Sequence, residues 1–272
     1  MDISDQLKET ANFLKANYAN PPSVGIVLGS GLGNFADEID VDKEIAYADI
    51  PHFPVSTVEG HKGKLVFGKL CGKTVVAMAG RFHFYEGYTA GDVVFPIRVM
   101  KLLGVETLLL SNAAGAVNPA YRVGDIMIIR DHISFFTPNP LIGKNLAEFG
   151  PRFPDMSEPY KRSLIDKAKV IAAKIDFDVH EGVYVSVTGP TFETRAEYQL
   201  IQVIGADVVG MSTVQENIVA NHMGMGVFAI SIVTDLGIRP DDSIITHEEV
   251  LQAAKEAEPK LALLFKELVA AI

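Results

Sequence analysis

A glycine-rich loop is the first group of residues in the chain that could do chemistry. Residues 26–35 are IVLGSGLGNF, so a short apolar strand leads directly into Gly29, Ser30 and two further glycines. A dinucleotide fingerprint would need G-x-G-x-x-G, and a P-loop would end in Gly-Lys-Ser/Thr; neither pattern is present. The loop is therefore either a tight turn from strand to helix or a set of backbone N–H groups that, with the Ser30 hydroxyl, binds one small anion.

A second group, GRFHFYEGY at residues 80–88, carries side chains that suit an anion. Arg81 and His83 are two residues apart after a predicted strand, so in an extended segment they project to the same side. A guanidinium and an imidazole suit a phosphate, and Tyr85 adds a hydroxyl donor. The alternative is a surface arginine beside a core histidine.

Four further segments follow predicted strands or begin predicted helices. Small residues in SNAAGAVNP would let a ligand approach the backbone. In TGPTFETRAE, Phe192 offers a stacking surface and Glu193 an acceptor, although the helix dipole alone also favours a carboxylate at a helix start. Asp235 is either a ligand group or a turn residue. The segments are 111–119, 188–197, 210–216 (with Ser212) and 234–237.

These groups require a sheet that brings the ends of several strands together. Apolar strands alternate with amphipathic helices along the chain, which predicts a mostly parallel sheet covered on both faces. Ligands bind at the carboxyl edge of such sheets. We expect strands at 24–28, 64–67, 74–79, 106–110, 125–130, 182–187, 207–210 and 227–233, and helices at 3–18, 91–103, 159–174, 195–204, 214–223 and 247–271.

No repeat or low-complexity linker divides the chain, so we expect a single domain over residues 1–272. The stretch 134–159, rich in Pro, Gly and Asn, is long for a passive connection and predicts a functional or mobile segment.

The composition argues against several classes of protein. The 272 residues are 48% hydrophobic and carry a formal net charge of −10, which argues against a nucleic-acid partner. No apolar run reaches the roughly 20 residues of a membrane span, and the N-terminus has no apolar signal segment. The single cysteine, Cys71, fits a reducing compartment. We therefore expect a cytoplasmic protein without a membrane partner, and the lack of clustered His or Cys predicts no metal.

A series of motifs, in order, resembles the trimeric purine nucleoside phosphorylase family. The motifs are GSGLG, GHKG (residues 60–63), GRFHFYEGY, SNAAG, GDIMIIRDHI, RFPDMSEPY, GPTFET, GADVVGMSTV and THEEV, spread over about residues 5–270. The resemblance implies a single α/β domain whose mixed, mostly parallel sheet forms a distorted barrel surrounded by helices. It implies reversible phosphorolysis of purine (deoxy)ribonucleosides such as inosine and guanosine, a pentosyl transfer in purine salvage. Inorganic phosphate is then a co-substrate, and neither cofactor nor metal is needed.

The resemblance also implies a role for each candidate residue, with the glycine loop holding phosphate rather than a nucleotide. Phe153 would enter the site of a neighbouring subunit, so a homotrimer is expected. His83, Glu193 and Asp235 are the implied catalytic residues. The implied contacts are phosphate at Ser30, His61, Arg81, His83, Ser212 and the backbone N–H of Ala113; the base at Phe192, Glu193, Thr234 and Asp235; and the ribose at Tyr85, Met211 and His247.

Asp235 departs from the pattern, because family members that act on 6-oxopurines usually carry asparagine there. An amide can donate to purine N7 and O6, whereas an ionised carboxylate only accepts. Relatives that cleave methylthioadenosine also carry aspartate, but they lack a counterpart of Glu193, and His247 fits a polar 5′-hydroxyl. We expect 6-oxopurine nucleosides as substrates, with 6-aminopurine nucleosides (adenosine or methylthioadenosine) as the alternative.

Two other functions are compatible with a nucleoside pocket. A nucleoside hydrolase uses water, which needs no set such as Ser30, Arg81, His83 and Ser212, and the acidic metal cluster typical of such hydrolases is not found in the sequence. A non-catalytic nucleoside sensor would keep the pocket, and a test of substrate turnover separates it from an enzyme.

Overall fold

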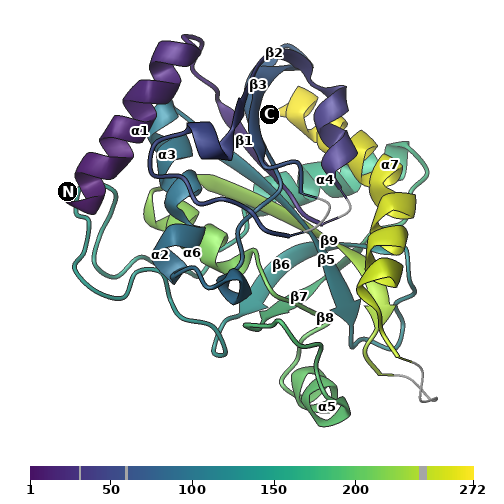
Figure 1. Cartoon of the computed structure of the whole chain (residues 1–272). Coiled ribbons are helices and arrows are strands. Elements are labelled where there is room, and N and C mark those ends of the chain that lie inside the picture. Colours follow the sequence, from purple (N-terminus) through teal and green to yellow (C-terminus); the bar gives the residue numbers. More distant parts are fainter. Residues whose placement is uncertain (31, 59–60, 239–243) are drawn as a thin grey trace.

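The computed structural model describes residues 1–30, 32–58, 61–238 and 244–272 (Figure 1). Its strands form one nine-stranded sheet in the order β2–β3–β4–β1–β5–β8–β7–β6–β9. Five strand pairings are parallel and four are antiparallel, so the sheet is mixed. The strands are β1 Val24–Leu28, β2 Asp40–Ala46, β3 Lys64–Leu70, β4 Lys73–Ala79, β5 Thr107–Ala116, β6 Ile126–Ile133, β7 His180–Ser186, β8 Val208–Gly210 and β9 Gly226–Leu236.

Part of this sheet closes into a barrel through the pairing of β5 with β9. These strands run parallel from Thr107 beside Gly226 to Ala116 beside Leu236. The pairs β9–β6, β6–β7, β7–β8 and β8–β5 complete the ring. From β5, the strands β1, β4, β3 and β2 continue as an open sheet. The single α/β domain with a distorted barrel, predicted from the sequence, is confirmed.

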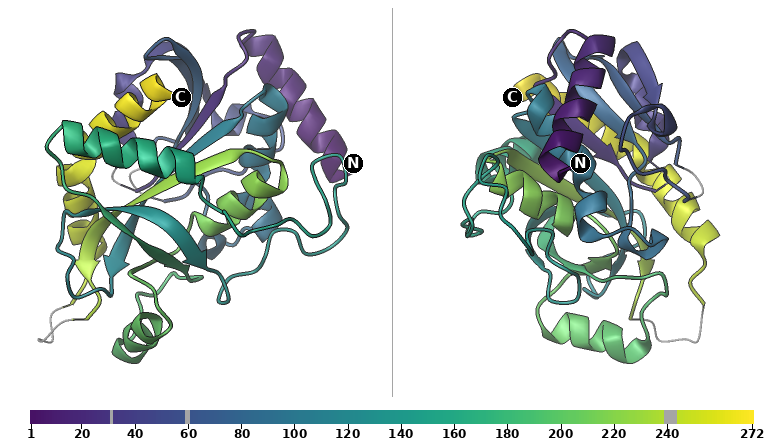
Figure 2. Two further views of the ribbon diagram at one scale, coloured as in Figure 1. Left: turned by 180° about the vertical axis from the view of Figure 1, so that it is seen from behind. Right: turned by 60° about the vertical axis from the view of Figure 1, so that its left-hand side comes forward.

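Helices cover this sheet on two sides (Figures 1 and 2). On one side α1 packs on α3, and α3 packs on α6; on the other, α4 packs on α7, which lies against β9. The helix α5 stands at the lower end of the molecule in Figure 1. The helices are α1 Ile3–Asn17, α2 Ala90–Val93, α3 Phe95–Leu103, α4 Arg162–Lys174, α5 Arg195–Val203, α6 Val214–His222 and α7 His247–Ala271, with short 3₁₀ turns at Gly33–Glu38, Tyr47–Asp49 and Phe84–Glu86.

Local sequence explains why these elements form. Leu7, Ala11 and Leu14 recur at helical spacing and are buried on one face of α1, and the Asp2 side chain caps its start by accepting from the Ser4 N–H at 2.9 Å. All five residues of β1 are buried, as expected for a strand with helices on both faces. No helix in the described part of the chain has the length and hydropathy needed to cross a bilayer.

The extra length of β5 and β9, relative to the prediction, changes the nature of two candidate loops. The prediction ended these strands at Leu110 and Val233, but β5 and β9 continue to Ala116 and Leu236, because their last residues pair with each other across a bulge after Ala114. The SNAAG segment and most of the TDLG segment are therefore strand, not loop.

Two further elements differ from the prediction. The edge strand β2 was not expected, because its sequence DVDKEIA is charged and only Ile45 is buried; it pairs with β3 on one side only. The predicted helix at 91–103 is divided at Val94 into α2 and α3, with Pro96 in the first turn of α3.

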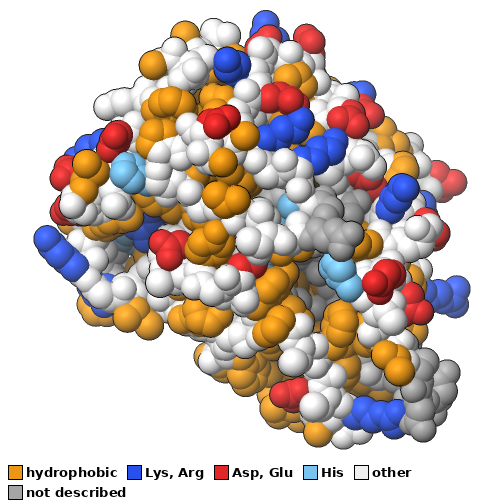
Figure 3. Space-filling model, in the orientation of Figure 1, with side chains coloured by type: hydrophobic (Ala, Val, Ile, Leu, Met, Phe, Trp, Pro, Cys, Tyr) orange, Lys and Arg blue, Asp and Glu red, His pale blue; other side chains and the backbone are white. Residues whose placement is uncertain are grey.

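The segment 134–159 contains neither helix nor strand. It exposes three large apolar side chains: Phe135 is 89% exposed, Ile142 79% and Phe153 88%. Apolar side chains also gather at the lower end of the molecule (Figure 3), where Leu200 and Val203 of α5 are exposed.

Candidate active site

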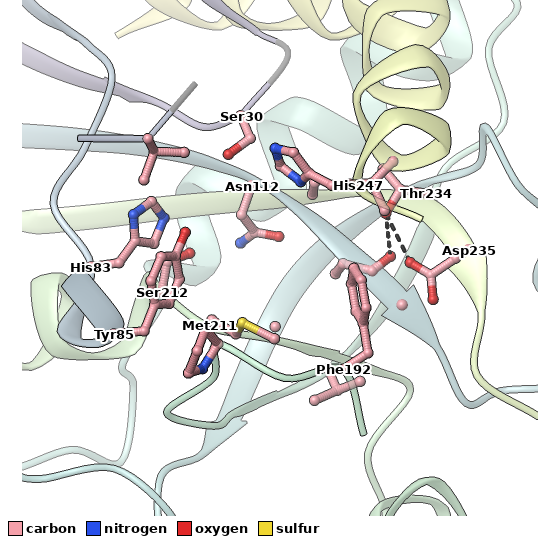
Figure 4. Close-up of a pocket in the computed structure, with 18 of the residues that line it drawn as sticks. Ser30, His83, Tyr85, Asn112, Phe192, Met211, Ser212, Thr234, Asp235 and His247 are labelled. Atoms are coloured by element: carbon pink, nitrogen blue, oxygen red, sulfur yellow. Dashed lines mark hydrogen bonds between the residues drawn. The ribbon is translucent and has the colours of Figure 1, made fainter. Parts of the chain in front are cut away.

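A cavity of about 480 Å³ lies where the ends of β1, β4, β5, β8 and β9 meet the first turn of α7 (Figure 4). Among the predicted site residues, all but His61 and Phe153 line it. One side carries Ser30, His83 and Ser212, and the opposite side carries Thr234 and Asp235. The predicted residues in its wall are Ser30, Arg81, His83, Tyr85, Ala113, Phe192, Glu193, Met211, Ser212, Thr234, Asp235 and His247.

His83 is oriented by Glu86, a residue that the sequence analysis did not single out. One Glu86 oxygen accepts from the His83 backbone N–H at 2.8 Å and lies 3.1 Å from Nδ1 of the ring. Because a carboxylate only accepts, Nδ1 carries the proton and Nε2 is left for a ligand. The other oxygen accepts from Thr57 N and Oγ1. Burial opposes ionisation of Glu86, but these four bonds outweigh it and lower its pKa to about 2.

Arg81 is buried (1% exposed) and bonded on three sides by the protein. Its Nε and Nη2 donate to the two Glu216 oxygens at 3.1 and 2.8 Å, and Nη1 donates to the Ser111 carbonyl. The Nε and Nη2 edge of the guanidinium is therefore bound to Glu216 and does not face the cavity. Only the remaining N–H groups are available to the cavity.

His61 lies behind the cavity rather than in its wall. Its Nε2 is 3.3 Å from Ser30 Oγ, and its ring stacks on His83 with centroids 5.5 Å apart. Burial, followed by the charges of His83 and Arg81, lowers the pKa of His61 to about 4. Gly80 makes room for this ring: its φ is +112°, and a Cβ there would lie 2.6 Å from the His61 Cβ.

The described part of the glycine loop forms a turn, in which Leu32 N donates to Gly29 O at 3.1 Å. Ser30 contributes its side chain to the cavity. Gly31 of this loop, and Gly60, the first residue of the GHKG motif, lie outside the described residues.

Ser212 is presented by an unusual turn between β8 and α6. Thr213 has φ 71° and ψ −48°, and Val214 N donates to Ser212 O at 2.8 Å, which is the rarer and more strained form of γ-turn. Asn112 supports it, because Nδ2 donates to Thr213 Oγ1 at 2.8 Å. A strained turn in a non-glycine residue is held in place only by its surroundings, and such turns cluster at ligand sites.

The opposite end of the cavity is acidic. Glu193 and Asp235 both line it, with Phe192 and Tyr198 beside them. Burial raises the pKa of Glu193, and the Asp235 carboxylate raises it further. Thr234 Oγ1 donates to Asp235 Oδ1 at 3.1 Å, and Gly115 permits the close approach of this side chain, since a Cβ there would lie 2.7 Å from Asp235 Oδ2.

Between these two ends lie the residues that the sequence analysis expected at the ribose. Tyr85 stacks on His83 with ring centroids 4.6 Å apart. His247 is the first residue of α7, whose start is fixed by reciprocal bonds between Thr246 and Glu249. Met211 completes this set in the cavity wall. Phe153 does not line the cavity of its own chain.

The residues missed by sequence reasoning are those that hold other side chains in place. Glu86, Asn112 and Glu216 are of this kind. The only available signals were proximity to motifs: Glu86 lies three residues after His83, and Asn112 lies within SNAAG. Glu216 in the first turn of α6 is indistinguishable in sequence from an ordinary helix-start carboxylate. Within the described residues, no group of three or more His, Cys, Asp or Glu side chains is placed to hold a metal ion.

Comparison with known proteins gives matches along nearly the whole chain. A family model described as the phosphorylase superfamily matches residues 23–270. Purine nucleoside phosphorylase 1 of Bacillus subtilis is 50% identical over 268 residues, covering 98% of this chain and 99% of that protein. Purine nucleoside phosphorylase of Bos taurus is 46% identical, covering 98% of this chain and 95% of that protein.

Solved structures agree with the sequence matches. Isoform 2 of purine nucleoside phosphorylase from Schistosoma mansoni, in complex with cytosine and ribose-1-phosphate, matches with a TM-score of 0.94 at 44% identity. The match covers 98% of this chain and 96% of that chain. Schistosoma mansoni purine nucleoside phosphorylase in complex with inosine matches with a TM-score of 0.91 at 40% identity, with the same coverage.

Proposed function

The chain belongs to the phosphorylase superfamily, and we propose that it catalyses the reversible phosphorolysis of purine nucleosides. The products are a free purine and (deoxy)ribose 1-phosphate. One observation carries the proposal: a single cavity has polar groups suited to hydrogen phosphate (Ser30, His83 and Ser212) at one end and two carboxylates suited to a base (Glu193 and Asp235) at the other. Purine nucleoside phosphorylase 1 of Bacillus subtilis is 50% identical to this chain over almost its full length.

The reaction exchanges one bond at C1′ of the sugar. A phosphate oxygen attacks C1′ while the bond from C1′ to N9 breaks and its electron pair leaves with the purine. The proton of hydrogen phosphate ends on the purine, so atoms and charge balance without a protein nucleophile. The protein's part is to position the phosphate below C1′ and to stabilise the charge on the departing base.

At the phosphate end, neutral polar groups lie beside the Arg81 charge, which is already paired with Glu216. The Ser30 and Ser212 hydroxyls, the Ala113 N–H and the remaining Arg81 N–H groups donate to the phosphate oxygens. Burial lowers the pKa of His83 although its bond to Glu86 opposes this, and with the proton on Nδ1 the neutral ring accepts at Nε2 from the O–H of hydrogen phosphate. The stack of Tyr85, His83 and His61 supports this orientation, since each ring limits the rotation of the next.

At the base end, Phe192 packs on the purine and Glu193 accepts from N1–H. Asp235 stabilises the leaving base at N7 when it holds a proton. Burial and the Asp235 charge both raise the pKa of Glu193, so the two carboxylates disfavour being ionised at the same time. We infer 6-oxopurine nucleosides, inosine and guanosine, as the preferred substrates.

A second substrate class is favoured by one observation. Asp235 Oδ1 accepts from Thr234, so this carboxylate is already held as an acceptor toward the cavity. An ionised carboxylate in this position would accept from the 6-amino group of adenosine or methylthioadenosine. Schistosoma mansoni purine nucleoside phosphorylase, which has been solved with adenosine, matches this chain at 42% identity and a TM-score of 0.93.

The remaining expectations belong to the same proposal. The reaction uses inorganic phosphate as co-substrate and no cofactor or metal. Phe153, which is 88% exposed, is proposed to enter the cavity of a neighbouring subunit in a homotrimer. Light scattering would then give three times the 29.5 kDa mass of the chain. A cytoplasmic location is proposed on the presence of one free cysteine, Cys71.

Product identification tests the proposed reaction. The protein is incubated with inosine and phosphate, and the products are followed by ³¹P NMR. We expect a signal of ribose 1-phosphate that grows in step with hypoxanthine. Free ribose with no phosphate ester would assign the chain to hydrolysis, and binding of inosine without any product would assign it to a non-catalytic sensor.

A further inference from the structure

A second cavity, of about 150 Å³, lies between α3, the end of α6 and the segment 140–146. We call it the Arg98 cavity. Its polar wall consists of Arg98 from α3, Lys144 and Asn145 from the loop, and His222 from the last turn of α6. No carboxylate of the described residues lines it.

Arg98 is a buried cation without an anion. It is 7% exposed, and no hydrogen bond or ion pair joins it to another described residue. The Arg98 guanidinium carbon lies 6.0 Å from the centroid of the Phe149 ring. An arginine is rarely buried unless it is paired, because removing its charge from water costs several kcal/mol. The other buried arginine, Arg81, differs in this respect, because the Glu216 carboxylate lies 2.8 Å from its guanidinium and balances its charge.

One further positive charge, that of Lys144, lines the Arg98 cavity, and burial and Arg98 lower the pKa of the remaining titratable group, His222. The Lys144 side chain is exposed at the mouth, and no described residue forms an ion pair with it. His222 Nε2 lies 3.2 Å from Asn145 Oδ1, so this ring is tied to the loop that closes the cavity. Asn145 Nδ2 donates to the Gly150 carbonyl at 3.0 Å, so the donors left for a ligand come from Arg98 on α3 and Lys144 on the loop.

We propose that the Arg98 cavity binds a small tetrahedral oxyanion, of which inorganic phosphate is the representative. The guanidinium fork binds two oxygens of such an anion, and the Lys144 ammonium adds a point charge at the mouth. The volume admits an anion of this size but not a nucleoside. Neutralising Arg98 in this way removes the cost of its burial, so the anion stabilises the folded chain.

This site is separate from the candidate active site but shares a helix with it. Ser212 precedes α6 and lines the large cavity, whereas His222 ends α6 and lines the Arg98 cavity. At 1.5 Å per residue, they lie about 15 Å apart along the helix. The proposal does not depend on the reaction proposed above.

Calorimetric titration with inorganic phosphate at constant ionic strength tests this proposal. We expect two phosphates per chain for the unaltered protein and one for Arg98→Met, which keeps the side-chain length but removes the charge. If the proposed phosphorolysis fails, the counts become one and none, so the two failures are distinguishable. An unchanged count in a folded Arg98→Met variant overturns the second site.

A second variant, at an exposed residue, keeps the proposal testable if Arg98→Met does not fold. Lys144→Ala removes an exposed charge, and we expect it to weaken one class of phosphate sites by about two- to fivefold. Lys43→Ala, which removes an exposed lysine on β2, is the matched control. Equal affinities in these two variants contradict the proposal.

Anion identity and location are tested on the same protein. Acetate at equal ionic strength should not occupy the site, and binding of acetate as tight as that of phosphate overturns a tetrahedral site. Crystals soaked in selenate should show anomalous density beside Arg98. Density for a carboxylate of a second chain at that place overturns the proposal.

Discussion

At the scale of the residue, the state of Arg81 decides how the phosphate end works. Its charge is balanced by a buried carboxylate, Glu216, and its plane is fixed by three bonds to the protein. A guanidinium held in this way does not have to reorient when a ligand arrives, which is the benefit of fixed donors in a site. Glu216 is thus a positioning residue that acts through Arg81.

Glu216→Gln should separate this positioning role from a purely structural one. Leaving the Arg81 charge unpaired should lower the free energy of unfolding by about 3 kcal/mol. It should also raise the KM for phosphate with less effect on the KM for nucleoside. Urea unfolding and initial rates at varied phosphate give both quantities. The control is Glu106→Gln, an exposed carboxylate. Equal changes in both KM values would contradict a role through Arg81.

Asp235 is the residue that sets base preference in this account. Asp235→Asn keeps the shape and the bond from Thr234 but replaces an acceptor by a donor at Oδ2. A mismatch at one buried hydrogen bond costs about 1–3 kcal/mol, so the ratio of kcat/KM for inosine over adenosine should rise at least fivefold. Parallel rate measurements on both nucleosides check this, with the exposed Asp49→Asn as control. An unchanged ratio would mean that Asp235 does not contact the base.

At the scale of the element, sequence patterns located the site but assigned some of its residues to loops when they lie on strands. Apolar runs such as Val24–Leu28 predicted the strands, and the polar residues after them predicted the edge at which the cavity lies. The ends of β5 and β9 were predicted as loops because small residues follow Leu110 and because Asp235 is a typical turn residue. They are strand residues because β5 and β9 pair with each other, a contact between distant segments that local sequence does not contain.

The γ-turn at Thr213 was unpredictable for a related reason. Threonine rarely adopts a positive φ, so nothing in MSTV signals such a turn. The turn is held by Asn112, which is distant in sequence. Sequence patterns therefore gave the residue types at the cavity, whereas pairs such as Arg81 with Glu216 needed the fold.

Gly80 tests how tightly the turn after β4 is built around His61. Gly80→Ala places a Cβ 2.6 Å from the His61 Cβ at a φ of +112°, whereas Gly124→Ala meets nothing within 4 Å at a φ of +91°. Both should lose about 1 kcal/mol or more from backbone strain, but only Gly80→Ala should also raise the KM for phosphate. Urea unfolding and phosphate kinetics on both variants measure this. Identical kinetics would show that the His61 position is unimportant.

At the scale of the whole molecule, buried histidines link stability to pH. Burial lowers the pKa of both His61 and His132 to about 4. In the unfolded chain each has a pKa near 6.5, so between these values the unfolded state binds more protons. The free energy of unfolding should therefore reach its full value above pH 6.5 and should decrease as the pH drops toward 4.

Urea unfolding at pH 7, 5.5 and 4.5 measures this slope. The variants His61→Gln and His132→Gln should each flatten it, because one proton fewer is taken up on unfolding. Saturating phosphate should also flatten it for the unaltered protein, since an anion beside His61 and His83 favours their charged forms. A slope that neither variant alters would assign the effect to other groups.

The most direct test of the central claim is base release from inosine with and without inorganic phosphate, with adenosine in parallel. We predict that hypoxanthine is released only when phosphate is present and faster than adenine from adenosine. Phosphate-dependent release from adenosine alone would keep the reaction and reverse the base preference. Release of hypoxanthine at the same rate without phosphate would contradict the account, because the nucleophile would then be water.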